Sequence, residues 1–191
     1  MHRLPGWVTS LQVIGSRKIR NLALIGFMGS GKSSIGRATA DLMRFQFVDT
    51  DELIETRAKK RITEIFAQDG ETAFRQWESK IVSELEQAQG LIISTGGGLP
   101  THQPNLDSLK QHSLVVCLWA SPEKIYERVK TQTHRPLLHV ADPLDRIRTL
   151  LAERKPAYKQ ADVLVISEGR TVREVAQQLA AQFHLASKTG A

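Results

Sequence analysis

The feature that most constrains the fold of this sequence is an apolar segment that runs directly into a glycine-rich loop. Residues 22–25 are apolar, and residues 26–33 read Gly-Phe-Met-Gly-Ser-Gly-Lys-Ser, the pattern Gly-x-x-x-x-Gly-Lys-Ser. Glycines let the backbone turn so that successive N–H groups face phosphate oxygens. A helix after the loop presents its positive end to the same anion. The pattern therefore predicts a strand, a phosphate-binding loop and a helix, with Lys32 reaching the outer phosphates and Ser33 ligating magnesium.

The rest of the chain alternates short apolar segments with longer stretches of helical pattern. This alternation is typical of one three-layer α/β domain, in which crossover helices cover a parallel sheet. We expect strands at residues 20–25, 45–48, 91–94, 113–119 and 162–166. We expect helices near residues 32–43, 51–59, 62–67, 71–88, 102–111, 121–130, 142–155 and 171–183. Because such sheets bind ligands at the carboxyl ends of their strands, site residues are expected just after each strand.

The formal net charge of +6 raises the question of nucleic-acid binding. Residues 1–40 contain six basic residues and no acidic one, so the other 20 basic residues equal the 20 acidic residues in number. Binding to nucleic acid requires a basic patch or stripe. Here the excess charge belongs to the N-terminal segment and the phosphate loop, so we expect no nucleic-acid partner.

The two ends of the chain differ in composition from its middle. We expect an N-terminal arm at 1–19, one domain at 20–184 and a C-terminal tail at 185–191. The sequence has no apolar run of the roughly 18–20 residues that cross a bilayer, and its one cysteine, Cys117, lies in an apolar segment that predicts a buried strand. We expect a cytoplasmic monomer without a membrane segment, or a plastid protein if residues 1–20 are the remnant of a transit peptide.

Two aspartates follow the predicted strand 45–48, at Asp49 and Asp51. Side chains at i and i+2 beyond a strand project to the same side, here toward the phosphate loop. One carboxylate can hold Mg²⁺ directly or through water, and the other can hydrogen-bond an acceptor hydroxyl and assist loss of its proton. One of the two can instead cap the helix that begins near Glu52.

The segment Thr-Gly-Gly-Gly at 95–98 follows the predicted strand 91–94. Three successive glycines carry a substantial backbone entropy cost. Such a run is expected where a ligand must approach the backbone closely, and the alternative is a flexible loop.

Taken together, these motifs resemble the shikimate kinase family. The motifs that carry the resemblance, in the family's order and spacing, are residues 26–33, Asp49-Thr50-Asp51, Phe74-Arg75-x-x-Glu78, Thr95-Gly96-Gly97-Gly98, Arg135-Pro136-Leu137-Leu138 and Arg154-Lys155-Pro156-Ala157-Tyr158 followed by Ala161-Asp162. The resemblance covers about residues 20–184. It implies a P-loop kinase fold with a five-stranded parallel sheet and a mobile lid. It also implies ATP- and Mg²⁺-dependent phosphorylation of the 3-hydroxyl of shikimate, a step of aromatic amino acid biosynthesis.

The resemblance also assigns expected roles to individual residues. The expected ATP-binding residues are Gly29, Ser30, Gly31, Lys32, Ser33, Ser34, Arg128, Arg135 and Arg170. The expected shikimate-binding residues are Asp51, Arg75, Gly97 and Arg154, and Mg²⁺ is expected at Ser33 and Asp49. The expected catalytic residues are Lys32, Asp51 and Arg135, the last on a lid that excludes water. Arginine suits the substrate carboxylate because its planar fork donates two parallel hydrogen bonds and keeps its charge.

Two alternative functions remain at this point. The chain can be a kinase for another small hydroxy acid, such as gluconate, or a catalytically inactive nucleotide-binding regulatory module. Inactive proteins of this kind usually lose the lysine, the magnesium ligand or the carboxylate that contacts the acceptor. All the residues in question are present here, namely Lys32, Ser33, Asp49, Asp51 and Arg135. An arginine pair suited to a carboxylate also argues against a nucleotide as the acceptor.

Overall fold

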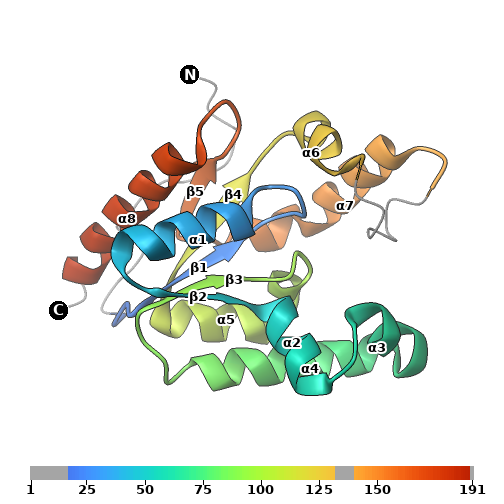
Figure 1. The fold of residues 1–191 in the computed structure, drawn as a ribbon, viewed down its shortest axis with the longest axis horizontal. Helices are drawn as coiled ribbons and strands as arrows, with labels where there is room; N and C mark the ends of the chain where they lie inside the picture. The colour runs from blue at the N-terminus through green and yellow to red at the C-terminus, as the bar shows by residue number, and fades with distance from the viewer. Residues whose placement is uncertain (1–16, 132–139, 190–191) are drawn as a thin grey trace.

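The structure is a computed structural model that describes residues 17–131 and 140–189 (Figure 1). Within these ranges, five parallel strands form one sheet in the order β2-β3-β1-β4-β5. The strands are β1 (Asn21–Ile25), β2 (Gln46–Asp49), β3 (Leu91–Ser94), β4 (Ser113–Trp119) and β5 (Val163–Ile166). All five strands predicted from the sequence are therefore confirmed, each within one residue of its expected ends.

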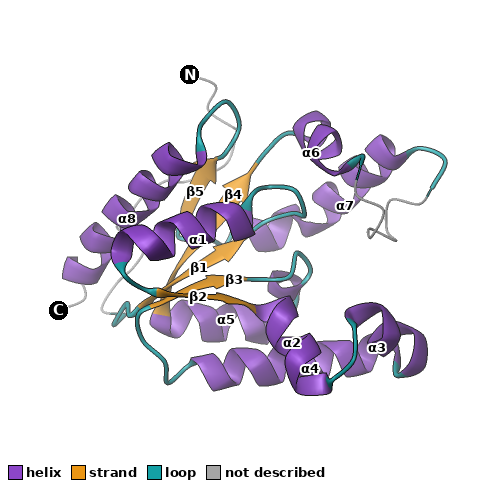
Figure 2. Cartoon of the chain, viewed as in Figure 1, coloured by secondary structure: helices purple, strands orange, loops and turns teal. Residues whose placement is uncertain are grey.

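Helices connect the strands and cover both faces of the sheet (Figure 2). They are α1 (Lys32–Met43), α2 (Thr50–Ala58), α3 (Ile62–Gln68), α4 (Gly70–Leu85), α5 (Gln103–His112), α6 (Pro122–Val129), α7 (Pro143–Tyr158) and α8 (Val172–Thr189). A short 3₁₀ helix, η2 (Leu99–Thr101), precedes α5 and was not expected from the sequence. The described part of the chain contains no helix that is long and apolar enough to cross a membrane.

The central strand β1 explains why the domain has three layers. All its residues are buried, and side chains of a strand alternate between its two faces. Leu22 and Leu24 pack in a cluster with side chains of α1 and α8, whereas Ala23 and Ile25 pack in a second cluster with side chains of α4, α5 and α7. The sheet is thus buried on both faces, which leaves the carboxyl ends of its strands as the place for a site.

Helix α8 extends beyond the end that we expected from the sequence. The helix was predicted to end at residue 183, with a tail from 185 onward, but it continues to Thr189. Ala186 is fully buried in the same cluster as Val175, Leu179 and Phe183. These four residues recur at helical spacing, so one apolar stripe continues past residue 183 and keeps the last turns against the sheet.

The residues just before β1, which we expected to belong to an N-terminal arm, contact the domain. The Arg17 guanidinium donates to the Asp162 carboxylate at 2.7 Å and to the Lys110 carbonyl at 2.6 Å, and Ile19 is buried. Cys117 is buried in β4, as expected. Burial raises the pKa of its thiol to about 12, so at neutral pH the side chain is an uncharged core residue.

Candidate active site

The phosphate loop lies between β1 and α1, as the sequence predicted. Gly29 and Gly31 have φ angles of +74° and +100°, which disfavour residues with a side chain. A Cβ atom at Gly29 would also lie 2.7 Å from Cγ1 of Val129 on α6. Helix α1 begins at Lys32 and has no acidic residue in its first turn. The partial positive charge at its N-terminal end therefore faces the loop, and no carboxylate of that turn neutralises this charge.

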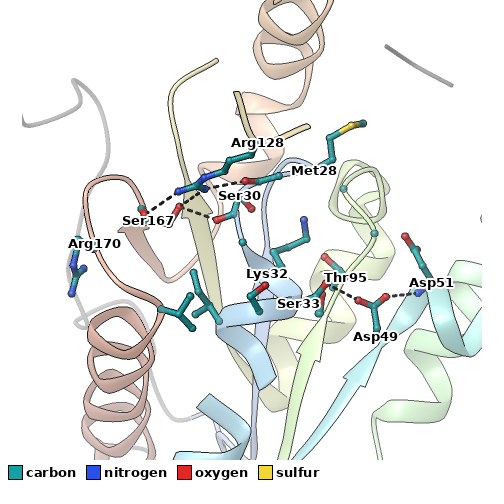
Figure 3. Close-up of a pocket in the computed structure, with 18 residues that line it drawn as sticks. Met28, Ser30, Lys32, Ser33, Asp49, Asp51, Thr95, Arg128, Ser167 and Arg170 are labelled. Atoms are coloured by element: carbon teal, nitrogen blue, oxygen red, sulfur yellow. Dashed lines mark hydrogen bonds between the residues drawn. The ribbon is translucent and has the colours of Figure 1, made fainter. Parts of the chain in front are cut away.

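A pocket of about 560 Å³ surrounds this loop at the carboxyl ends of the strands (Figure 3). Its lining residues are 28–35, Asp49, Asp51, 94–97, Arg128, Ser167, Arg170 and Val172. The pocket therefore brings together every expected ATP-binding residue that the structure describes, together with both aspartates and Gly97. Arg135 and the expected lid around it lie outside the described residues.

Lys32 lies against the phosphate loop itself. Its ammonium group donates to the carbonyl oxygens of Gly26 at 2.8 Å and of Phe27 at 3.0 Å. These contacts keep the charge at the edge of the loop, within the lining of the pocket. The position suits a cation that contacts the outer phosphates of a bound nucleotide.

Asp49 makes two contacts that correspond to the two interpretations of its role. Its Oδ1 accepts a hydrogen bond from the Asp51 backbone N–H at 3.1 Å, which caps α2. Its Oδ2 accepts a hydrogen bond from the Ser33 hydroxyl at 3.3 Å, so the two side chains lie side by side in the lining of the pocket (Figure 3). A hydroxyl and a carboxylate are ligands that suit Mg²⁺, which keeps several of its waters in proteins. Among the described residues, no group of three or more His, Cys, Asp and Glu side chains could hold a metal.

The three glycines at 96–98 each lie against a different charged side chain. A Cβ atom would lie 2.6 Å from Asp51 Oδ1 at Gly96, 3.1 Å from Arg154 Nη1 at Gly97, and 3.0 Å from Arg75 Nη1 at Gly98. None of the three has a positive φ. Their common property is therefore the absence of a side chain, which supports the interpretation of close approach over that of a flexible loop.

Arg75 is fixed by two carboxylates of its own helix, α4. Its guanidinium donates to Glu78 at 2.7 Å and to Glu71 at 2.9 Å. Glu78 is only 1 % exposed. Burial raises the pKa of the Glu78 carboxyl above its ordinary value, and the Arg75 charge acts in the opposite direction. The buried carboxylate thus holds Nη1 of the guanidinium, the same nitrogen that lies 3.0 Å from the Cβ position of Gly98.

Arg154 approaches the same segment from α7. Its guanidinium carbon lies 5.4 Å from the centre of the Phe27 ring, a cation–π contact with the phosphate loop. Two arginines from different helices therefore flank the glycines. Arg154 also hydrogen-bonds to the Tyr158 side chain, but it has no carboxylate partner among the described residues.

Arg128 and Arg170 line the other end of the pocket. Arg128 donates to the carbonyl oxygen of Gly29 at 2.9 Å and to the hydroxyl and carbonyl of Ser167, both at 3.3 Å. Arg170 bonds to Gln178 and to the Glu174 carbonyl. Arg128 is therefore anchored to the phosphate loop, whereas Arg170 is held by α8.

Ser167 is a pocket residue that the sequence reasoning missed. It is 3 % exposed, and its hydroxyl donates to the Ser30 carbonyl at 2.8 Å. It comes directly after β5, so the rule that sites follow strand ends would have found it. Gly96 also lines the pocket, whereas the sequence predicted a role only for Gly97, the middle glycine of the three. Nothing in the sequence pattern indicated the hydrogen bond from the hydroxyl of buried Tyr158 to the Gly97 carbonyl.

The parallel sheet, the phosphate loop with its lysine and the adjoining Ser–Asp pair define a P-loop kinase. Comparisons with known proteins agree and are more specific. The chain belongs to the shikimate kinase family, whose family model matches residues 28–184. A shikimate kinase from Thermodesulfovibrio yellowstonii is 41% identical over 165 residues, which cover 86% of this chain and 95% of that protein.

Solved structures give the same result. The structure of a shikimate kinase from Acinetobacter baumannii in complex with shikimate is 34% identical and has a TM-score of 0.83, covering 94% of this chain and 99% of that one. A gluconokinase from Sinorhizobium meliloti has a TM-score of 0.61 at 18% identity, covering 90% of this chain and 95% of that one. At that identity the likeness shows a shared fold and does not favour gluconate as the acceptor.

Proposed function

We propose that this chain transfers the γ-phosphoryl group of ATP to the 3-hydroxyl of shikimate, giving shikimate 3-phosphate and ADP. The observation that carries the proposal is the position of Gly97. A Cβ atom there would lie 3.1 Å from Arg154 Nη1, 3.5 Å from the Gly26 carbonyl and 3.6 Å from the Met28 nitrogen. A carboxylate-binding arginine and the phosphate loop thus adjoin the same glycine. The complex of the Acinetobacter baumannii relative with shikimate supports the choice of acceptor.

In the donor half of the site, the loop N–H groups and Lys32 bind the outer phosphates. Ser33 and Asp49 would hold Mg²⁺, which would neutralise charge on those phosphates. Arg128 and Arg170 flank the nucleotide at the far end of the pocket. Little covalent chemistry is required of the protein, because phosphoryl transfer depends on positioning and electrostatic stabilisation.

In the acceptor half, Arg75 and Arg154 hold the carboxylate of shikimate through charge-assisted hydrogen bonds. The backbone at Gly97 contacts the ring, and the Asp51 carboxylate accepts hydrogen bonds from the ring hydroxyls. Asp51 orients the attacking hydroxyl and can accept its proton. Arg135 brings positive charge to the transferring phosphoryl group, since a loose transition state spreads charge over the equatorial oxygens.

An ADP-release assay with purified protein, ATP and Mg²⁺ tests this function when it is run with and without shikimate. We expect ADP formation to depend on shikimate, and gluconate or nucleoside monophosphates to replace it poorly. Lys32→Met and Asp51→Asn should each lower kcat by about a hundredfold or more, because each removes a group that acts on the reacting atoms. Lys124→Met is the matched control, since Lys124 pairs with Glu127 on the surface of α6. Absence of shikimate-dependent turnover in the parent protein would refute the proposal.

The arginine pair provides an independent test of the acceptor. A charge-assisted hydrogen bond contributes roughly 1.5–3 kcal/mol, so Arg154→Ala should raise the KM for shikimate about tenfold to a hundredfold. The KM for ATP should change far less. Equal effects on both substrates would argue against a carboxylate-binding role for Arg154.

A further inference from the structure

Tyr158, the last residue of α7, joins the core of the domain to the glycine segment. Its side chain is fully buried, and its hydroxyl donates a hydrogen bond to the Gly97 carbonyl at 2.7 Å. Burial raises the pKa of this hydroxyl, whereas the charge of Arg154 and a hydrogen bond between the Arg154 and Tyr158 side chains act in the opposite direction. The net pKa is well above its ordinary value, so the hydroxyl keeps its proton and remains a donor at all working pH values.

This bond determines how one peptide plane of the glycine segment is oriented. The described residues contain no cis peptide bond, so the Gly98 N–H points away from the carbonyl that Tyr158 holds. The neighbouring groups have other anchors, since the Gly96 N–H donates to the Thr50 hydroxyl at 3.0 Å and the Gly98 carbonyl accepts from the Thr101 N–H at 3.0 Å. Three successive glycines have wide conformational freedom, so without Tyr158 the 97–98 peptide would be the least restrained part of the segment.

The same helix brings Arg154 to the same glycine. Residues four apart lie on one face of a helix, one turn above the other. Arg154 Nη1 lies 3.1 Å from the Cβ position of Gly97, while Tyr158 bonds to the carbonyl of that residue. Helix α7 thus supplies both the guanidinium expected to bind the substrate carboxylate and the hydroxyl that fixes the adjoining backbone.

We propose that Tyr158 is a positioning residue, whose hydroxyl holds the Gly97 peptide in the orientation that receives the acceptor next to Arg154. The inference rests on the proposed function, because shikimate is the acceptor that this backbone would contact. The competing explanation is that Tyr158 only fills space in the core. The phenylalanine ring fills almost the same space, so the hydroxyl can be tested separately from the ring.

Tyr158→Phe is therefore the decisive variant, with Tyr126→Phe as its matched control. Tyr126 packs against the same core cluster from α6 and does not line the pocket. Loss of one hydrogen bond of about 1 kcal/mol should raise the KM for shikimate by about fivefold in Tyr158→Phe. The KM for ATP should stay within about twofold of the parent value, and the melting temperature should fall by only about 2–4 °C, the effect of one hydrogen bond. Tyr126→Phe should leave both KM values at those of the parent.

A second measurement requires no substrate. Amide hydrogen exchange of the unliganded protein should be faster over residues 95–101 in Tyr158→Phe, because the Leu99 and Thr101 N–H groups bond to glycine carbonyls of this segment. Exchange in Tyr126→Phe should match that of the parent over the same residues.

The outcomes separate the two proposals. Parental exchange and an unchanged KM for shikimate in Tyr158→Phe would overturn the positioning role. A parallel rise in both KM values together with a large loss of thermal stability would also overturn it, in favour of core filling alone. Failure of the parent protein to turn over shikimate would refute the proposed function, and the exchange measurement would still decide whether Tyr158 holds the segment.

Discussion

Asp51 and Gly96 lie so close together that residue 96 has no room for a side chain. A Cβ atom there would lie 2.6 Å from Asp51 Oδ1 and 3.3 Å from the carboxyl carbon. The Gly96 N–H also donates to the hydroxyl of Thr50, the residue before Asp51. These contacts connect the ends of β2 and β3, which are neighbours in the sheet. The Asp51 carboxylate can therefore occupy its position only because residue 96 has no side chain.

Gly96→Ala should displace the Asp51 carboxylate and lower kcat. Misplacement of a reacting group by about 1 Å can cost about a hundredfold in rate, and we expect a loss of that order. Gly98→Ala is the informative comparison, because its methyl group would meet the end of the Arg75 side chain at 3.0 Å. That variant should mainly raise the KM for shikimate. Steady-state kinetics of both variants, with melting temperatures to verify folding, check the prediction, and equal effects on kcat would contradict it.

The strands and the phosphate loop could be predicted from the sequence, whereas the contacts of glycines 96–98 could not. All five strands could be predicted because each is a short apolar run bounded by turn residues or a helix start. The phosphate loop could be predicted because its chemistry is local in sequence. The charged neighbour of each glycine could not be derived from the residues alone, because Asp51, Arg75 and Arg154 reach the segment from three separate helices. Such pairings depend on tertiary packing, which a local pattern does not encode.

Ser167 and Ala186 show two other limits. Ser167 follows β5 in a position that the strand-end rule covers, but a single serine has no motif around it. Ala186 continues an apolar stripe, but the residues after it, Ser-Lys-Thr-Gly-Ala at 187–191, contain no large apolar side chain, so their composition suggested a tail. In both cases the spacing along the chain indicated the role of the residue, but serine and alanine are too common at other positions to single it out.

Ser167→Ala should weaken ATP binding with little effect on shikimate. The hydroxyl donates to the Ser30 carbonyl of the phosphate loop, and Arg128 donates to the hydroxyl. Removal of the Ser167 hydroxyl leaves the buried Ser30 carbonyl without its donor, at a cost of about 1 kcal/mol. The KM for ATP should therefore rise about fivefold. Ser108→Ala is the control, because the Ser108 hydroxyl bonds to Glu86 and does not line the pocket. A larger change in the KM for shikimate than for ATP would count against the prediction.

His112 should make the stability of the protein depend on pH. His112 is 1 % exposed at the end of α5, and its Nδ1 lies 3.0 Å from the Asn21 amide nitrogen. That amide also donates to the Ala88 carbonyl, so Nδ1 is the acceptor and the ring is neutral. Burial and then the charge of Arg20 lower the pKa of His112 below its ordinary value of 6.5, while Glu86 acts in the opposite direction.

Because the folded pKa is depressed, the unfolded chain takes up a proton near pH 6.5 before the folded protein does. The contribution of neutral His112 to the free energy of unfolding is fully present above that pH. It falls as the pH drops below it, by at most about 1.4 kcal/mol per pH unit. His112→Asn keeps an acceptor oxygen and cannot titrate, so its melting temperature should fall less than that of the parent between about pH 7.5 and 5.5. His184→Asn, at an exposed position of α8, should retain the parental slope. Equal slopes in parent and His112→Asn would show that other groups cause the pH dependence.

Asp49→Asn should separate the magnesium role of Asp49 from its role as a helix cap. Asparagine is as good an N-cap residue as aspartate, so it can still accept the hydrogen bond from the Asp51 N–H. The amide lacks the negative charge that favours a divalent cation beside the Ser33 hydroxyl. We therefore expect a nearly unchanged melting temperature but an increase of about tenfold in the Mg²⁺ concentration needed for half-maximal activity.

Asp49→Ala tests the cap directly, because it removes both the charge and the acceptor. It should show the same Mg²⁺ requirement as Asp49→Asn, together with a loss of stability of about 1 kcal/mol from the uncapped N-terminus of α2. Titrations of Mg²⁺ at saturating ATP and shikimate, with thermal unfolding of each variant, provide the measurement. If Asp49→Asn keeps the parental Mg²⁺ requirement while Asp49→Ala loses activity only in proportion to its loss of folded protein, the carboxylate serves as a cap and the metal must be held by other groups.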